Sequence, residues 1–158
     1  MAITATPGAS DATSYASLAE AEAYMATLVH KDAWAGTDQT KEAALQQATR
    51  LLDTLAWKGR KATAEQALAW PRTGVTDRDG YEVGPAAIPA ALRNACAEFA
   101  FRLLGEDRAA DAGGLAPASL QVGSLNVSGL RRQVFPASVL EMVRDLREAG
   151  GCLQVVRG

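Results

Sequence analysis

The chain has 158 residues, which is enough for one domain with a substantial hydrophobic core. Its apolar fraction of 48% and charged fraction of 22% exclude an intrinsically disordered chain. The net charge of -2 argues against a free-standing DNA-binding protein, because such proteins are usually basic.

The N-terminal residues 1–16 are interpreted as a flexible arm. The segment lacks the basic start and apolar middle of a signal peptide. Ser17 then opens the first predicted helix, and Glu20 three residues later completes a capping box. One apolar stripe follows at helical spacing: Leu18, Ala21, Tyr24, Met25 and Leu28.

A second helix is predicted to start near Asp38 to Thr40. Its apolar positions recur with a helical period: Ala44, Leu45, Ala48, Leu51, Leu52 and Leu55. Gly59 is well placed to end it, and basic residues cluster near that end, where the helix dipole favours cations.

The stretch from Ala67 to Gly80, ALAWPRTGVTDRDG, is unusually rich in Trp, Pro, Gly and Asp for a connector. Pro71 biases Trp70 towards an extended backbone, and an indole at such a place most often fills a core. Arg72 is expected to brace helix carbonyls or a carboxylate. We interpret Trp70, Pro71, Arg72 and Gly74 as a rigid structural corner.

Two other roles for this stretch are DNA stacking and calcium binding. Stacking of DNA bases on Trp70, Trp57 or Trp34 is an alternative, although no basic stripe surrounds Trp70. Asp77 and Asp79 resemble the middle of a calcium loop, but its first and last ligand positions hold a valine and an alanine. The segment from Val75 to Val83 is therefore predicted to be a polar turn with Asp-Gly as its signal.

A third helix is predicted to start at Pro89, whose missing N–H costs nothing in a first turn. Its apolar face ends at Gly105, and its members share helical spacing: Leu92, Ala95, Cys96, Phe99, Ala100 and Leu103. A last helix is predicted from Pro136 to Gly150, followed by a tail that could form a short strand.

Between these helices, residues 106–133 lack a helical period. The sequence LQVGSLNV alternates apolar and polar residues around Gly-Ser, which predicts a two-residue hairpin. Four residues would share its apolar face: Leu120, Val122, Leu125 and Val127. The predicted fold is thus mainly α: a small bundle of about four helices, a β-hairpin, and extended N- and C-terminal arms. We treat residues 1–158 as one domain, with a helical core at 17–105, the hairpin loop at 106–133, and a helix and tail at 134–158.

The sequence offers no constellation for catalysis. His30 is the single histidine, and no Gly-x-Ser-x-Gly elbow, zinc spacing, Walker loop or dinucleotide fingerprint is present. The two cysteines, Cys96 and Cys152, are too few for a disulfide framework. No apolar run is long enough to span a membrane. We therefore expect neither an enzyme nor a metal or cofactor site.

Charge is segmented along the chain. Residues 1–40 carry a net charge of -4 and residues 41–72 one of +3, followed by -3 over 73–111 and +2 over 112–158. Such alternation suits faces that meet neighbours of opposite sign. Solvated helix faces explain any single block equally well.

The order of SYASLAEAEAY, ATRLLDTLAWKG, QALAWPRTGVTDRDG, IPAALRNACAEFAFRLL and VGSLNV resembles a family of phage proteins. These are similar to the head–tail connector proteins of long-tailed bacteriophages, and some relatives are labelled as primosomal-type, single-stranded-DNA-binding proteins. The resemblance covers roughly Ser14 to Val127, and the LAWPR-G core is its specific part.

The resemblance implies an adaptor in the neck of the virion, made in the cytoplasm of the bacterial host. Its subunits would form a ring, commonly a dodecamer, between the portal protein and the next neck or tail-completion protein, around the DNA channel. We expect subunit or partner contacts at the hairpin residues named above and at Arg131, Arg132, Leu153, Val155 and Val156, with the arginines near acidic groups or channel DNA. The alternative function is a phage single-stranded-DNA-binding protein of replication, which needs exposed aromatics beside a basic groove.

Overall fold

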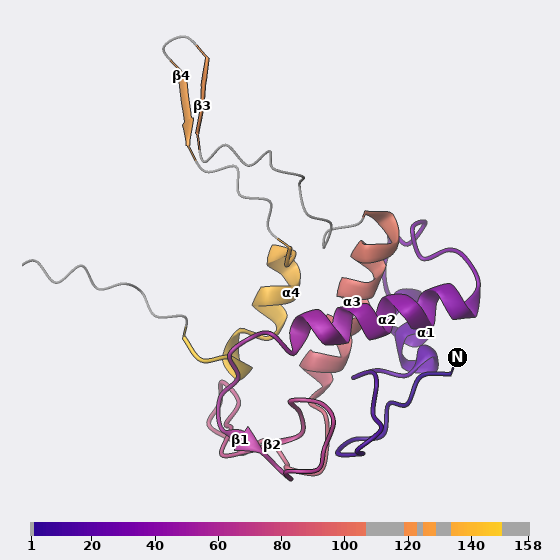
Figure 1. The fold of residues 1–158 in the computed structure, drawn as a ribbon, viewed down its shortest axis with the longest axis vertical. Coiled ribbons are helices and arrows are strands. Elements are labelled where there is room, and N and C mark those ends of the chain that lie inside the picture. The colour runs from indigo at the N-terminus through magenta and orange to yellow at the C-terminus, as the bar shows by residue number, and fades with distance from the viewer. Residues whose placement is uncertain (1, 107–118, 123–124, 129–133, 150–158) are drawn as a thin grey trace, which may run out of the picture.

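A computed structural model describes residues 2–106, 119–122, 125–128 and 134–149 (Figure 1). The helices are α1 (Leu18–Ala26), α2 (Asp38–Leu52), α3 (Ala90–Gly105) and α4 (Ala137–Met142), followed by a short 3-10 turn, η1 (Arg144–Leu146). Two antiparallel two-stranded sheets are formed by β1 (Arg60–Lys61) with β2 (Arg72–Thr73), and by β3 (Ser119–Val122) with β4 (Leu125–Ser128). The expected mainly α fold is confirmed.

Helix α3 is the centre of the bundle, because it packs against α1, α2 and α4 (Figure 1). Its buried face carries the predicted apolar positions Leu92, Cys96 and Phe99. Phe99 also packs against Phe135, just before α4, with ring centroids 5.4 Å apart. Among the described residues, no helix is both long enough and apolar enough to cross a bilayer.

The capping signals place the first two helices. Ser17 accepts a hydrogen bond from the Glu20 amide, and the Glu20 carboxylate accepts one from the Ser17 amide, which confirms the capping box. Thr37 caps α2 in the same way by accepting from the Thr40 amide. Each cap satisfies backbone donors that the first helical turn leaves free.

Helix α2 ends earlier than predicted. It stops at Leu52, and Gly59 lies in the loop beyond it rather than at its end. The chain turns away at Asp53, whose carboxylate is engaged by Tyr15 and by the Ala69 amide. Gly59 instead lies where the loop after α2 passes close to the backbone of Thr73.

The N-terminal segment is neither the extended nor the flexible arm that the sequence predicted. It turns at Pro7–Gly8 and at Ser10–Asp11, and it is packed against the bundle. Ala12, Tyr15 and Ala16 are buried in the core. The Tyr15 amide donates to the Thr49 hydroxyl of α2, and the Ala67 amide donates to the Ala9 carbonyl. The polar composition of residues 1–16 predicts an exposed segment. The buried side chains of Ala12, Tyr15 and Ala16 nevertheless hold it against the bundle.

The last helix is also shorter than predicted. Helix α4 ends at Met142, and the chain then passes through η1 into an extended segment. There Arg147 forms an isolated antiparallel bridge with Trp57. Two backbone hydrogen bonds flank it, from the Lys58 amide to the Leu146 carbonyl and from the Glu148 amide to the Ala56 carbonyl. The helix therefore gives way to strand-like pairing with the loop after α2.

The β3–β4 hairpin has the predicted register. Leu120 pairs with Val127, and Val122 pairs with Leu125. Among the described elements, β3 and β4 contact only each other. Gly123 and Ser124, the predicted loop, lie outside the described residues.

Candidate interaction surfaces and the corner that supports them

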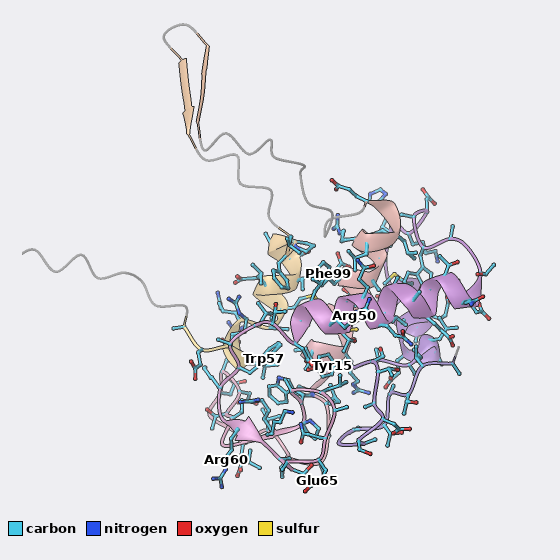
Figure 2. All side chains as sticks on the ribbon, viewed as in Figure 1. Tyr15, Arg50, Trp57, Arg60, Glu65 and Phe99 are labelled. Carbon is cyan, nitrogen blue, oxygen red and sulfur yellow. The ribbon has the colours of Figure 1, made fainter. Side chains whose placement is uncertain are left out.

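The predicted corner is built around two buried indoles. Trp70 is 1% exposed and Trp57 is 5% exposed, and their rings meet edge to face with centroids 5.8 Å apart. The peptide bond between Trp70 and Pro71 is cis. Figure 2 places Trp57 beside the C-terminal half of α2, on the same side as Tyr15. Burial of Trp70 was predicted, whereas its partner Trp57 was not.

Arg72 fastens the corner to the loop after α2. Its guanidinium donates to the carbonyls of Lys58 at 2.7 Å, Gly59 at 2.7 Å and Ala69 at 3.1 Å. These are loop carbonyls, not the helix carbonyls or carboxylate that the sequence suggested. The planar guanidinium spreads its donors over three nitrogens in a fixed fork, whereas a lysine donates from a single nitrogen.

Gly59 allows the two segments of the corner to approach. Its φ is +69°, and a Cβ built there would lie 2.1 Å from the Thr73 carbonyl oxygen. Only glycine fits this combination of positive φ and close contact. Gly74, in the predicted corner, also has a positive φ, of 73°.

A buried Tyr–Asp pair joins the N-terminal segment to the corner. The Tyr15 hydroxyl donates to the Asp53 carboxylate, which also accepts from the Ala69 amide at 3.3 Å. Burial raises the pKa of Asp53, and the hydrogen bond from Tyr15 opposes this shift. Burial, with the nearby Asp53 charge, also raises the pKa of Tyr15. The pair holds the N-terminal segment, the end of α2 and the corner together.

The segment from Val75 to Val83 is a tight hairpin turn, as predicted, and we call it the Tyr81 finger. Val75 is fully buried at its base, and the Val83 amide donates to the Val75 carbonyl at 2.8 Å. Gly80 takes a positive φ in the turn. Tyr81 is 74% exposed, which sequence reasoning did not anticipate although the aromatic directly follows the Asp-Gly signal.

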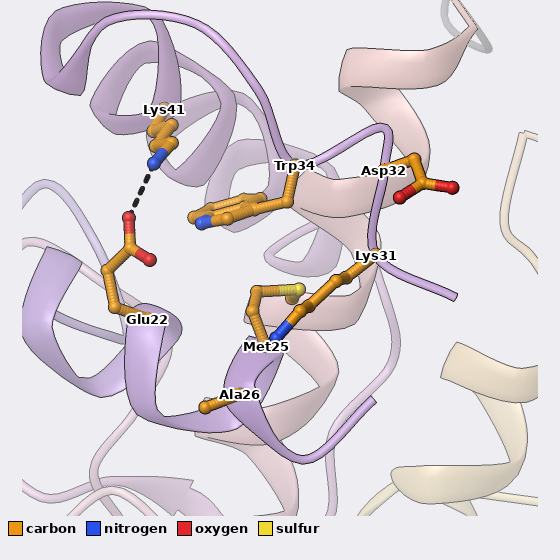
Figure 3. A pocket seen from close by; sticks show the side chains of 7 residues that line it. All are labelled: Glu22, Met25, Ala26, Lys31, Asp32, Trp34 and Lys41. Atoms are coloured by element: carbon orange, nitrogen blue, oxygen red, sulfur yellow. Dashed lines mark hydrogen bonds and ion pairs between the residues drawn. The ribbon is translucent and has the colours of Figure 1, made fainter. Parts of the chain in front are cut away.

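A pocket of about 380 Å³ opens at the other end of α2, and we call it the Trp34 pocket (Figure 3). Helix α1, the loop after it and the start of α2 supply its lining, which consists of Glu22, Met25, Ala26, Lys31, Asp32, Trp34 and Lys41. Lys41 donates to Glu22 at 2.6 Å and lies 5.5 Å from the Trp34 ring centroid. The hydrogen bond with Lys41 lowers the pKa of Glu22. The pocket thus combines an aromatic wall with charges of both signs.

Polar contacts also tie α1 to α3. Arg93 pairs with Glu20 at 2.6 Å, so the carboxylate of the capping box also reaches the third helix. Glu98 is buried, and it accepts from Arg102 at 3.1 Å and from the Tyr24 hydroxyl at 3.4 Å. These bonds leave the buried carboxylate paired, so we assign it a structural role.

Most of the predicted partner contacts fall where the structure gives no side chains. Leu120, Val122, Leu125 and Val127 have described backbone only. The other predicted contacts lie outside the described residues: Arg131, Arg132, Leu153, Val155 and Val156. Their roles at an interface remain predictions.

The described surface has few of the features that base stacking requires. All three indoles are nearly buried, with Trp34 the most exposed at 9%. The exposed aromatic Tyr81 sits among Asp77, Asp79 and Glu82. Within the described ranges, no group of three or more His, Cys, Asp or Glu side chains could hold a metal ion.

Comparison with known proteins gives one match. No curated protein and no solved structure matches the chain. The family described as "Putative DnaT-like ssDNA binding protein" matches residues 1–158, the whole chain. This agrees with the label carried by some relatives in the resemblance described above, and the chain therefore belongs to the family of putative DnaT-like single-stranded-DNA-binding proteins.

Proposed function

We propose that this protein is a structural component of a bacteriophage neck, a head–tail connector whose subunits form a ring between the portal and the next neck or tail-completion protein. The ring, commonly of twelve subunits in the proteins that the sequence resembles, would surround the DNA channel. The protein would be made in the host cytoplasm and would have no enzymatic activity.

The observation that carries this proposal is the β3–β4 hairpin. Its strands have four residues each, and among the described elements they contact only one another. A two-stranded hairpin is marginally stable by itself in water. Its register pairs apolar residues, Leu120 with Val127 and Val122 with Leu125. A subunit that places such a hairpin between two helices gains most from a neighbour that covers it.

The bundle supports an adaptor role for a second reason. Its core is continuous from the N-terminal segment through α4, and the corner fastens the loop after α2 with side chain-to-backbone bonds. A rigid body of this kind can transmit force between two docking surfaces without rearranging. The alternating charge of successive segments suits contacts between unlike faces of neighbouring subunits.

The second candidate function is single-stranded-DNA binding, and the family's description is the observation that favours it. Such binding combines a basic groove with exposed aromatic rings. Buried indoles and a net charge of -2 weigh against it. Contact with channel DNA through the backbone phosphates is compatible with a connector and requires no stacking.

Electron cryomicroscopy of particles that contain this protein tests the proposal. We expect a ring of this chain below the portal, and mass spectrometry of purified particles should detect it. Absence from particles, together with oligonucleotide binding by the purified protein that weakens steeply between about 50 and 200 mM salt, would establish the DNA-binding function instead.

A further inference from the structure

The cations of the described bundle differ in what neutralises them. Five of them lie within salt-bridge distance of a carboxylate: Lys41, Arg78, Arg93, Arg102 and Arg144. Four others gather around β1 and β2, and we call them the basic edge: Lys58, Arg60, Lys61 and Arg72. In the part of the chain that the structure describes, none of these four forms an ion pair.

The fold brings the four cations together. Lys61 pairs with Arg72 across the two strands, and Arg60 pairs with Thr73. The Arg72 guanidinium also reaches back to the Lys58 carbonyl at 2.7 Å. A basic patch therefore forms from two segments that are separated in the sequence, which shows no basic stripe around Trp70.

The hydrogen bonds of these cations leave their charge in place. Lys58, Lys61 and Arg72 donate to backbone carbonyls. Arg60 has no side-chain hydrogen bond to any described residue. A carbonyl is a neutral acceptor, so it orients a cation without cancelling its charge. The basic edge thus keeps the net positive charge that a carboxylate would remove.

Few carboxylates lie close in the chain to offset this charge. Within residues 58–73, four cations stand against one carboxylate, Glu65. The Asp53 carboxylate is engaged by the Tyr15 hydroxyl and the Ala69 amide. The Asp145 carboxylate lies 3.8 Å from Arg78. The edge is therefore a local source of positive potential on a chain whose net charge is -2.

The edge is also exposed and held in a fixed shape. Arg60 and Lys61 are both exposed, and Figure 2 shows Arg60 at the rim of the bundle. The backbone below them is fixed by the bonds from Arg72 and by the close approach of Gly59 to Thr73. Because this backbone is already ordered, binding an anion would cost little conformational entropy.

The neighbouring side chains identify the anion. Arginine and lysine are the residues that bind phosphates, and such contacts carry no sequence information. Trp57 and Trp70, the rings of the corner, are buried, so they offer no surface on which an unpaired base could stack. Duplex DNA hides its bases and presents about one negative charge per 1.7 Å of its axis. Cations without an exposed ring therefore suit the phosphates of a duplex.

The contact must also be weak, because a channel has to release the DNA that passes through it. Each subunit offers only a few exposed cations at this edge. The Tyr81 finger, which follows β2, adds the carboxylates of Asp77, Asp79 and Glu82 at the same end of the chain path. These carboxylates limit the affinity for a polyanion and favour a contact that forms and breaks easily.

We propose that the basic edge lines the DNA channel and contacts the backbone phosphates of the duplex that passes through it. This inference rests on the proposed ring-forming function, and it assigns the face of the subunit that points inward. The contact involves no base stacking, which separates it from single-stranded-DNA binding.

Photo-cross-linking from single cysteines in assembled particles tests this assignment. Cys152 is first replaced by serine, and Cys96 is left, because it is fully buried and burial raises the pKa of its thiol to about 11. Arg60→Cys is then labelled with azidophenacyl bromide, assembled into particles and irradiated. We expect the label to join this chain to the packaged DNA.

The matched control is Lys31→Cys, carrying the same label. Lys31 is also an exposed cation without an ion pair, but it lies in the loop before α2, whereas β1 lies beyond the other end of that helix (Figure 1). Helix α2 has 15 residues, so it spans about 22 Å. We expect at least tenfold less cross-linking to DNA from this position.

The salt dependence of duplex binding by the purified protein is a second measurement. Arg60→Ala/Lys61→Ala should reduce the slope of log affinity against log salt by about two, one for each phosphate contact, while Lys31→Ala leaves it unchanged. Both side chains are exposed, so the double variant should keep the melting temperature of the parent. An unchanged slope, or no duplex binding by the parent, would overturn the inference.

The other failures separate this inference from the proposed function. Rings in which the label at Arg60→Cys joins only protein, or in which both positions label DNA equally, would overturn the inference and leave the connector function standing. A preference for single-stranded DNA with quenched tryptophan fluorescence would replace duplex contact by base stacking and overturn it as well. Particles without any ring of this chain would overturn the proposed function and the inference with it.

Discussion

At the scale of single residues, the corner is held by contacts that each depend on one side chain. Trp70 fills the core beside Trp57, Arg72 satisfies three loop carbonyls, and Gly59 lets two segments cross. Tyr15 and Asp53 add a buried polar link from the N-terminal segment. These contacts involve different groups, so substitutions can separate their contributions to stability.

Trp70→Ala should lower the free energy of unfolding by about 3–5 kcal/mol, the range for removing a large aromatic side chain from a core. The ring is 1% exposed and packs edge to face against Trp57, so the cavity cannot be filled from solvent. Urea unfolding followed by tryptophan fluorescence measures the change. A variant that unfolds like the parent but loses oligonucleotide binding would make Trp70 a ligand contact.

Gly59→Ala should destabilise the protein by more than Gly80→Ala does. Both glycines have positive φ, so each alanine carries the left-handed backbone cost of about 1–2 kcal/mol. A Cβ at Gly59 also meets the Thr73 carbonyl at 2.1 Å, whereas one at Gly80 meets nothing within 4 Å. The difference in melting temperature between the two variants measures the cost of the steric clash at Gly59. Equal decreases in melting temperature would show that the backbone at Thr73 moves to accommodate the added Cβ.

Tyr15→Phe should destabilise the protein at pH 7 by about 1.5–3 kcal/mol, the typical worth of a hydrogen bond to a charged group. Burial raises the folded-state pKa of Asp53 above its unfolded value, and the bond from Tyr15 limits that rise. The folded state therefore binds the proton more tightly, and this contribution to stability is lost as the pH rises through the folded pKa.

Asp53→Asn is the matched variant for this prediction. It keeps an acceptor for Tyr15 and the Ala69 amide but removes the buried charge. We expect this variant to be at least as stable as the parent at pH 7. We also expect its free energy of unfolding to lack the pH dependence that the raised pKa of Asp53 causes. Urea unfolding from pH 4 to 8 checks both variants, and an unchanged pH dependence in Asp53→Asn would contradict the assignment.

At the scale of elements, the chain after α4 is joined to the loop after α2. Leu146 is nearly buried and its carbonyl accepts from the Lys58 amide. The Lys58 ammonium donates to the Asp145 carbonyl at 2.8 Å. Pairing with these backbone groups is an alternative to further helix, which accounts for the early end of α4.

Deletion of Leu153 to Gly158 should leave the melting curve unchanged, because the contacts that fasten this end of the described bundle lie at Asp145 to Glu148. Leu146→Ala should lower the free energy of unfolding by about 2–5 kcal/mol. Calorimetry distinguishes the two. The deletion should weaken attachment to the portal or the next neck protein, which a particle-assembly assay measures, and a large loss of melting temperature on deletion would place the tail in the subunit core.

At the scale of the whole molecule, the protein combines a packed helical body with a hairpin that contacts no other described element. In the proposed ring, neighbours supply what the hairpin lacks. The body then sets the spacing of the subunits, and the hairpin supplies a contact between them.

Hydrogen exchange should therefore distinguish the free subunit from the assembled ring. The amides of β3 and β4 should exchange quickly in the monomer and slowly in particles, whereas the amides of α3 should be protected in both. Exchange measured by mass spectrometry on the two samples checks this. Equal protection of the hairpin in monomer and ring would place it in the core of the subunit and remove the main support for the proposed function.

The sequence by itself determined the elements whose signals are local. The Ser17 capping box, the start of α2, the apolar face of α3, the Asp-Gly turn and the hairpin register all follow from residues close together in the chain. Burial of Trp70 also followed, because Pro71 favours an extended backbone at Trp70 and an indole at such a place most often fills a core. Caps, turns and strand alternation involve neighbours, so their physics can be evaluated without knowing the fold.

Only the tertiary structure decided how distant segments use one another. Several contacts join residues far apart in sequence: Tyr15 with Asp53 at the end of α2, Arg72 with the Lys58 carbonyl, and Trp57 with Arg147. The exposure of Tyr81 and the pocket beside Trp34 likewise could not be predicted from either segment alone. Competing hydrogen bonds and buried area determine these outcomes, and both depend on which groups the fold brings together.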